Sequence, residues 1–288
     1  MPGWWQDLTD LVLPAECGGC GRPRAALCAQ CGDALCGAVP RRVRPDPRPS
    51  GLPVVHAAAP YEGAVRAVLL AHKERGALGL AGPLGVGLAG AVRAGLRLRD
   101  GGAFVGGGAS VRGDASVRGD APVHGAASVG GDASGRGDAP VLLVPVPSAR
   151  GAVRARGHDP VRRIALAAAG ELRRGGTRAR VLCVLRQRRA VADQSGLNFR
   201  ERQANLQGAL EVTAGGGRLI AGGGRVVLVD DLMTTGATLA EAARAICDAY
   251  TESKERRAAV TAREIACENT ITAAVVASSP DSFGINRN

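Results

Sequence analysis

Short aliphatic runs alternate with amphipathic stretches along the C-terminal half of the chain. Short, mostly aliphatic runs are typical of strands buried on both faces, and apolar residues three or four positions apart indicate helices. The pattern predicts strands at Val141–Val146, Val181–Leu185, Val226–Val229 and Ile271–Ala277. It predicts helices at Val153–Arg173 and Thr238–Tyr250, and a polar helix or loop at Asn198–Leu206. Because strands alternate with helices, we expect an α/β fold with a parallel, doubly wound sheet.

The N-terminal part of the chain predicts helices. The spacing of apolar residues, interrupted by Gly and Pro, indicates helices at Glu62–Ala71 and Leu78–Leu98. The Pro- and Arg-rich stretch Arg41–Pro53 predicts a linker. The chain therefore divides into four parts, namely a segment 1–40 that carries most of the cysteines, a helical part 54–100, an insertion 101–140 and a core 141–288.

The insertion is a six-residue repeat, three of whose six units have the form V-x-G-D-A-S/P. The units begin at Val105, Val111, Val117, Val123, Val129 and Gly135. Six-residue repeats can build a parallel β-helix. Here Val is the only sizeable apolar residue in each unit, so little surface would be buried to offset the lost conformational entropy. The composition therefore favours a disordered insertion.

Composition and charge narrow the possible partners. Hydrophobic residues make up 45% of the 288 and aromatic residues 2%, so the core must be built from Val, Leu, Ala and Ile. The formal net charge is +11, and between Val141 and Leu210 there are 14 Arg, no Lys and four acidic residues. A basic surface attracts phosphates, whether on a small diphosphate ligand or on a nucleic-acid backbone. Arginines on solvated helices would give the same charge, so the charge alone leaves both open.

The sequence also predicts where the protein resides. No apolar run approaches the roughly 20 residues that a membrane-spanning helix needs. Residues Met1–Asp10 lack the basic start and apolar stretch of a signal peptide. We therefore expect no membrane span and a cytoplasmic location, where paired cysteines more often bind metal than form disulfides.

Four cysteines have the spacing of a metal site. Cys17-x2-Cys20 and Cys28-x2-Cys31 form two short turns, each of which places two thiolates on one side. Two such turns complete a tetrahedral set of four sulfur ligands with no open position, which predicts a structural zinc ion. Cys36 is a fifth thiol, either a spare ligand or a small buried residue.

The stretch Val226–Thr238, V-V-L-V-D-D-L-M-T-T-G-A-T, predicts a phosphate site. A buried strand brings Asp230 and Asp231 to the carboxyl edge of the sheet, where ligands bind in open α/β folds. The following loop, Met233–Thr238, opens a helix, so its free N–H groups and threonine hydroxyls can surround a phosphate. Ribose hydroxyls are the natural partners of the paired acids, with Mg2+ nearby to neutralise a diphosphate.

This stretch closely resembles the signature of type I phosphoribosyltransferases. Further segments resemble the competence-protein F (ComF) family, whose members join an N-terminal zinc knuckle to such a domain. They are Cys17–Cys31, Tyr61–Gly76, Val144–Pro147 with Arg154–Gly157, and Gln194–Ala209. The resemblance implies a type I phosphoribosyltransferase-like parallel sheet flanked by helices, with a small zinc knuckle.

The resemblance also implies a ligand, phosphoribosyl diphosphate (PRPP) with Mg2+, and roles for individual residues. Asp230 and Asp231 would hold the ribose hydroxyls and act as the catalytic carboxylates, while the Arg188–Asn205 segment would close over the site. Further PRPP contacts are expected from Val229, Met233, Thr234, Thr235, Gly236, Ala237, Thr238, Lys73, Pro147, Ser148, Arg154 and Arg156.

Three functions remain open at this point. The protein could transfer phosphoribosyl to an acceptor that the sequence does not name. It could instead be a non-catalytic module that handles single-stranded DNA or works with DNA-uptake machinery, or a regulator that senses PRPP without turnover. The oligomeric state is open as well.

Overall fold

The structure, a computed structural model, describes residues 16–99, 139–189, 199–255 and 271–284. The predicted hexapeptide insertion therefore lies, apart from residues 139 and 140, outside the described residues, as does most of the segment 251–270. All statements below concern the described ranges.

A mostly parallel sheet of six strands organises the chain. In spatial order it contains β1 (Arg41–Val43), β2 (Val54–Pro60), β8 (Thr272–Ser278), β7 (Arg225–Met233), β3 (Val141–Pro145) and β4 (Ala179–Val181). Neighbouring strands are parallel except for β1, which pairs with β2 in the antiparallel sense. The mixed α/β class and the mostly parallel sheet agree with the sequence prediction.

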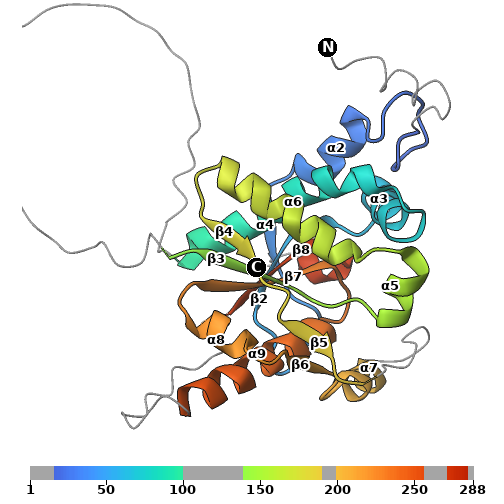
Figure 1. Ribbon diagram of the computed structural model, residues 1–288. Helices are drawn as coiled ribbons and strands as arrows, with labels where there is room; N and C mark the ends of the chain where they lie inside the picture. The colour runs from blue at the N-terminus through green and yellow to red at the C-terminus, as the bar shows by residue number, and fades with distance from the viewer. Residues whose placement is uncertain (1–15, 100–138, 190–198, 256–270, 285–288) are drawn as a thin grey trace, which may run out of the picture.

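Helices cover both faces of this sheet (Figure 1). One face packs against α3 (Gly63–Glu74), α4 (Ala81–Arg99) and α6 (Pro160–Arg174), and the other against α8 (Gly216–Ala221) and α9 (Ala237–Glu255). Successive side chains of a strand point to opposite faces. Val141 and Leu143 therefore enter the first core and Leu142 enters the second. Burial on both faces explains why these strands are continuous apolar runs.

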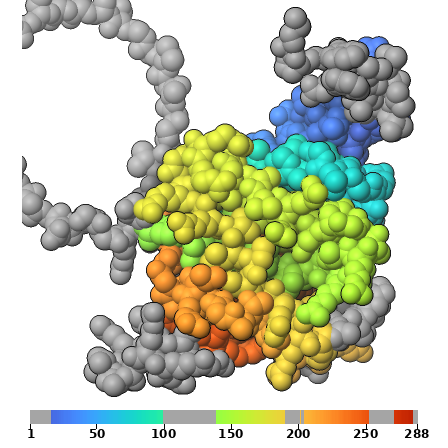
Figure 2. Space-filling view, in the orientation of Figure 1, coloured from blue at the N-terminus to red at the C-terminus, as the bar shows by residue number. Residues whose placement is uncertain are grey.

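Smaller elements extend this three-layer body. The knuckle region carries α2 (Ala29–Cys36), and in Figure 2 its blue surface borders the cyan surface of the α3–α4 region at one end of the molecule. A separate antiparallel hairpin pairs β5 (Leu185–Gln187) with β6 (Leu210–Val212). The remaining elements are η1 (Leu78–Leu80), α5 (Arg150–Arg156), α7 (Phe199–Leu206) and η3 (Pro280–Phe283).

The predicted helix Val153–Arg173 is wrong as a single element. The chain forms α5 and α6, separated by Gly157 in the left-handed conformation (φ 73°) and by Asp159, whose carboxylate caps α6 by accepting from the Arg162 N–H at 3.1 Å. Glycine reaches this conformation at no steric cost, and a cap followed by Pro160 starts a new helix.

The strand predictions need three corrections. Val181–Leu185 is not one strand, because β4 ends at Val181 and β5 begins at Leu185 in a different sheet. The stretch Arg41–Pro53 is not only a linker, because its first three residues form edge strand β1. The part 54–100 is not purely helical, because it opens with β2, a buried strand of the main sheet.

Helix α4 bears on the expectation about membrane spans. Residues Leu78–Leu98 are long and apolar enough, by length and composition alone, to cross a membrane, and half of this stretch is buried inside the protein. Leu84, Leu88 and Val92 lie in the first core with at most 1% of their surface exposed. The helix therefore packs on the sheet as the core helix of a globular domain does.

Helix α4 runs antiparallel to β2. Its residue Gly87 lies beside Ala58, where an added Cβ would be 3.4 Å from the alanine Cβ, and Gly95 lies beside His56, which is nearer the start of the strand. The end of α4 is therefore at the amino ends of the parallel strands, the same side as the start of β3.

Candidate functional site

A cleft of about 460 Å3 opens at the carboxyl ends of β3 and β7. Ligands of open α/β sheets bind at this edge. The residues that line the cleft come from α3, the β3–α5 connection, α5, α6, the hairpin, α7, β7, the β7–α9 connection and the start of α9. They are Lys73, Val146, Pro147, Ser148, Ala149, Ala152, Arg156, Val161, Gln187, Leu206, Leu210, Asp230, Asp231, Leu232, Thr234 and Thr238.

Strand β7 carries the two carboxylates of the cleft. It continues to Met233, so Asp230 and Asp231 are part of the strand and do not follow it, as the predicted end at Val229 implied. Side chains of adjacent strand residues point to opposite faces. Asp231 points to the face covered by α3, where it is 5% exposed, and its N–H donates to Asp230 Oδ1 at 2.8 Å.

Lys73 supplies the positive charge beside these two carboxylates. Its Nζ lies 3.0 Å from Asp231 Oδ2. Burial alone would lower the pKa of Lys73, but the charges of Asp231 and Asp230 outweigh it and the pKa is raised. Lys73 therefore stays protonated and compensates a charge that would otherwise be costly to bury.

Within the described residues Asp230 accepts the Asp231 N–H but forms no ion pair as short as that of Asp231 with Lys73. It is half-buried in the lining of the cleft, and desolvation raises its pKa well above the ordinary value, with the adjacent charge of Asp231 adding to the effect. Lys73 acts in the opposite direction but does not compensate fully. Such a carboxyl favours binding a cation or a hydrogen-bond donor, since either would stabilise its charged form.

The connection from β7 to α9 presents hydroxyls and a helix N-terminus. Thr234 and Thr238 line the cleft, and α9 begins at Ala237. The Thr235 hydroxyl accepts from the Ala237 N–H at 3.5 Å, so it serves the helix start. A helix N-terminus has unpaired N–H groups and a positive dipole end, which favour an anion by about 0.3–1 kcal/mol.

Gly236 is required by the backbone at this turn. Its φ of 76° lies in the left-handed region, and an added Cβ would be 3.0 Å from Leu52 Cδ2. The resemblance predicted a PRPP contact from this glycine. The structure gives it a further role, since it also makes room for the β1–β2 connection.

On the opposite wall, the β3–α5 connection contributes Pro147 and Ser148. The Ser148 hydroxyl donates to Asp159 Oδ1 at 3.3 Å, which ties this connection to the start of α6. Arg156 also lines the cleft, but its guanidinium donates to Glu74 Oε1 at 3.2 Å. Arg154, which was expected beside it, is exposed on α5 and does not line the cleft.

The structure thus brings together only part of the predicted set. Eight predicted residues line the cleft, namely Lys73, Pro147, Ser148, Arg156, Asp230, Asp231, Thr234 and Thr238. Val229 and Met233 are buried in the two cores, and Thr235, Gly236 and Ala237 contribute to the helix start without lining the cleft.

Sequence reasoning missed Gln187, Leu206 and Leu210, which line the cleft from the hairpin and the end of α7. No local signal identifies them, because their place depends on how the hairpin packs. That packing is fixed by Glu241 of α9, whose carboxylate accepts from the Leu210 N–H at 3.1 Å.

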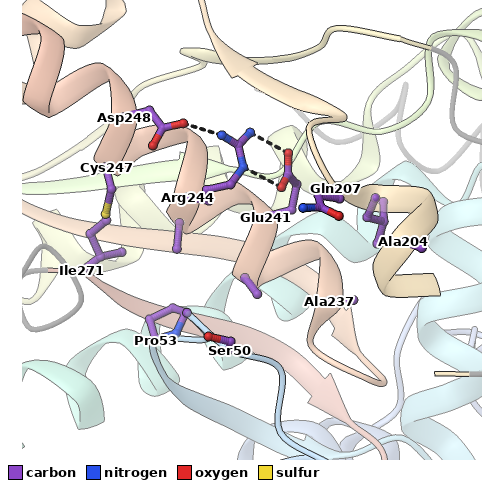
Figure 3. Close-up of a pocket in the computed structure, with 14 residues that line it drawn as sticks. Ser50, Pro53, Ala204, Gln207, Ala237, Glu241, Arg244, Cys247, Asp248 and Ile271 are labelled. Carbon is purple, nitrogen blue, oxygen red and sulfur yellow. Dashed lines mark hydrogen bonds and ion pairs between the residues drawn. The ribbon is translucent and has the colours of Figure 1, made fainter. Parts of the chain in front are cut away.

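A larger cavity of about 700 Å3 lies along α9 and shares Leu206 with the cleft (Figure 3). Ala240, Ala243 and Ile271 give it apolar walls. Its Arg244 lies between Glu241 and Asp248 and is paired with both, and it also donates to the Leu210 carbonyl at 3.0 Å. These charges join the hairpin to α9, so the smaller cleft, with its carboxylate pair and helix start, is the better candidate for chemistry.

The four predicted cysteines form a second candidate site. The sulfur atoms of Cys17, Cys20, Cys28 and Cys31 all lie within 4.8 Å of one another, and those of Cys20 and Cys28 are 3.7 Å apart. Tetrahedral zinc with Zn–S bonds of about 2.3 Å requires sulfurs about 3.8 Å apart. The group could therefore hold a structural metal ion. Cys36 is outside it, exposed, with its thiol directed at the Pro83 carbonyl.

The protein prepares one of these sulfurs as a thiolate. Burial would raise the pKa of Cys17, but backbone N–H groups, above all that of Cys28 at 3.3 Å from the sulfur, lower it to about 6. Burial raises the pKa of Cys31, and its neighbouring thiols add to the shift. Thiolates are the form that binds metal, and a metal ion would relieve the cost of holding four of them together.

Comparison with known proteins adds no identification. No protein-family model matches this chain, and no curated protein matches it.

Proposed function

We propose that this protein binds PRPP with Mg2+ in the cleft at the carboxyl edge of the sheet. The observation that carries the proposal is the junction of β7 and α9, where Asp230 and Asp231 lie near the end of a buried strand, shortly before a threonine-rich helix start. The proposal places the protein with the type I phosphoribosyltransferase-like proteins of the competence-protein F type, and in the cytoplasm.

The chemistry of the cleft suits this ligand. The carboxylates can accept hydrogen bonds from the ribose 2′- and 3′-hydroxyls, and Thr234, Thr238 and the start of α9 can hold the 5′-phosphate. Lys73 and Arg156 supply positive charge, and Mg2+ would neutralise the diphosphate further.

In the proposed reaction, a nucleophile attacks the anomeric carbon of the ribose while the bond to the diphosphate oxygen breaks. Positive charge develops on the ribose as the diphosphate leaves, and the carboxylates of Asp230 and Asp231 would stabilise it. Gln187 and Leu210, which also line the cleft, would meet the acceptor.

Calorimetric titration with PRPP and Mg2+ tests this proposal. We expect the wild-type protein to bind, and Asp230→Asn or Asp231→Asn to weaken binding by about tenfold or more, because charge-assisted hydrogen bonds are lost. Asp281→Asn is the matched control, since it makes the same change at an exposed carboxylate outside the cleft. Absence of binding in the wild type would refute the proposal.

A screen for diphosphate release separates the transferase from the PRPP-sensing regulator. Nucleobases are added one at a time to protein, PRPP and Mg2+, and free diphosphate is measured. Release that depends on the base and is lost in Asp230→Asn supports transfer. Binding without release for any base supports the regulator.

A second candidate function, binding of single-stranded DNA, has its own supporting observation. Arg173, Arg178 and Arg180 surround a hollow of about 270 Å3 that also includes Pro140 and Ala179, at the amino ends of β3 and β4. All three arginines are exposed. This surface lies at the opposite edge of the sheet from the cleft, so the two functions would not compete for one site.

A further inference from the structure

Helix α3 connects the cysteine group to the cleft. Val68 and Ala71 of α3 lie against the turn between Cys17 and Cys20, and Lys73 in the last turn of the helix pairs with Asp231 of β7. The two candidate sites therefore contact the same helix.

The knuckle side of this connection is tightly packed. An added Cβ at Gly18 would be 2.7 Å from Leu80 Cδ1 and 3.4 Å from Ala71 Cβ, and one at Gly19 would be 3.3 Å from Val68 Cγ2. The backbone between the first two cysteines thus rests directly on α3 and η1. Arg75, at the end of α3, also donates to the Gly18 carbonyl at 3.4 Å.

The cleft side involves consecutive residues of the last turn of α3. His72 contacts the Pro160 carbonyl at 3.5 Å, Lys73 pairs with Asp231 at 3.0 Å and Glu74 pairs with Arg156 at 3.2 Å. A shift or fraying of this turn would therefore change the charge balance of the cleft at two places, the acidic pair and Arg156.

The knuckle has almost no core of its own to hold its shape. The described cluster around the metal-binding sulfurs consists of three buried cysteines with only Leu27 and Ala64 packed against it. In such small units metal binding supplies much of the folding free energy, about 10 kcal/mol or more. Without metal, the Cys17–Cys20 turn would lose its fixed geometry and α3 would lose the packing described above.

We propose that metal at the four cysteines positions Lys73. The metal fixes the knuckle, the knuckle fixes α3, and α3 holds the ammonium group against Asp231. Loss of the metal then lowers the affinity of the cleft for an anionic ligand at a distance. The part of this inference that concerns PRPP rests on the proposed function, but the coupling itself does not.

Hydrogen exchange tests the coupling without any ligand. Zinc is removed from the full-length protein by a chelator, and amide exchange is followed by mass spectrometry. We expect exchange across Gly63–Glu74 to speed up by about tenfold or more while exchange in α9 stays the same, because α3 packs on the knuckle whereas α9 lies on the other face of the sheet. Unchanged exchange in α3 after verified zinc loss would overturn the proposal.

A double-mutant cycle tests whether the effect runs through Lys73. We expect Cys31→Ser and Lys73→Met each to weaken PRPP–Mg2+ binding by about tenfold, and the double variant to be no weaker than Lys73→Met alone within about twofold. Two fully additive effects would mean that the knuckle does not act through Lys73. Cys36→Ser is the matched control, because this thiol lies outside the group.

A second pair of variants leaves all four cysteines in place, in case Cys31→Ser fails to fold. Gly18→Val forces side-chain atoms into Leu80 and should separate the knuckle from α3, whereas Gly32→Ala meets only Leu27 at 4.0 Å. With zinc content and circular dichroism unchanged, only Gly18→Val should speed exchange in α3; equal exchange in both would contradict the proposal. If the wild-type protein does not bind PRPP, the proposed function is refuted. The hydrogen-exchange results would still test the coupling between the knuckle and α3.

Discussion

At the scale of single residues, His56 is the least expected member of the core. It lies in β2 with 2% of its surface exposed, and neither ring nitrogen has a hydrogen-bond partner within the described part of the chain. Burial lowers its pKa, and the positive charge of Arg42 adds to the effect. Burial also lowers the pKa of His72, despite its carbonyl partners.

These histidines predict a loss of stability in mild acid. Because their pKa values are lower in the folded state, the unfolded chain binds more protons once the pH falls below about 6.5. The free energy of unfolding should therefore have its highest value well above the unfolded-state pKa. It should decrease as the pH falls from 7.5 to 5.5. His56→Leu should reduce this decrease and raise stability at pH 7.5 by about 1 kcal/mol, since it removes unpaired buried nitrogens.

Urea unfolding of both proteins across this pH range checks the prediction. Wild type and His56→Leu with the same pH dependence would show that His56 does not titrate between the folded and unfolded states.

Residue chemistry also marks the limit of what the sequence can predict about the site. Asp230, Asp231 and Thr234 are contiguous, so a local motif is enough to find them. Lys73 comes from a distant segment and was found only through a resemblance. Neither a local motif nor the resemblance pointed to Gln187. It reaches the cleft because it lies on a short strand whose position depends on Glu241.

At the scale of elements, the contact between α4 and α6 depends on one glycine. An added Cβ at Gly85 would be 2.5 Å from Ala167 Cβ and 2.8 Å from the backbone nitrogen of Ala168. Backbone atoms cannot rotate away as a side chain can, so the two helices would have to separate. Small residues here let the helices approach closely, in a core whose described buried residues are Leu, Ala, Val and Ile.

We therefore expect Gly85→Ala to lower the free energy of unfolding by about 1–3 kcal/mol, as overpacking does. Gly82→Ala is the matched control in the same helix, because it is exposed and an added Cβ meets nothing within 4 Å. It should leave stability unchanged or raise it by up to about 1 kcal/mol. Chemical unfolding measures the free energy of unfolding of both variants. Equal values for Gly85→Ala and Gly82→Ala would contradict the described packing.

The strands and helices that were predicted correctly have an apolar pattern that extends over many residues. Most of the strands that were missed are too short for such a pattern. The strand starting at Val141 and the helix α9 are long enough for their apolar pattern to stand out. Strands β4 and β5 have three residues each, too few for any period to appear. Strand β2 reads V-V-H-A-A-A-P, and its alanines and histidine have low strand propensity, so only its pairing with β8 explains it.

At the scale of the whole molecule, charge is unevenly distributed between the two edges of the sheet. The cleft carries two carboxylates with Lys73 and Arg156, whereas the described residues that line the hollow at the amino ends of the strands include three arginines and no acidic residue. A polyanion would therefore be attracted to the arginine edge rather than to the acidic pair.

We expect labelled oligo-dT to bind with strong salt dependence, losing about tenfold or more in affinity between 50 and 200 mM salt. Arg180→Glu should weaken binding severalfold and reduce the salt dependence, because it removes a phosphate contact. Arg218→Glu, an exposed arginine on α8 in the other helical layer, is the control. Fluorescence anisotropy measures all three proteins, and equal weakening by both variants would indicate non-specific attraction to the net charge.

The direction of α4 has a consequence for how this sequence can change over time. The helix ends at the amino ends of the strands and β3 starts on the same side, so the described segments on either side of the six-residue repeat lie across the sheet from the cleft. Duplication or loss of repeat units at that point changes the length of the chain by multiples of six without entering the segments that line the cleft. The tract can therefore drift in length while selection on the cleft continues unaffected.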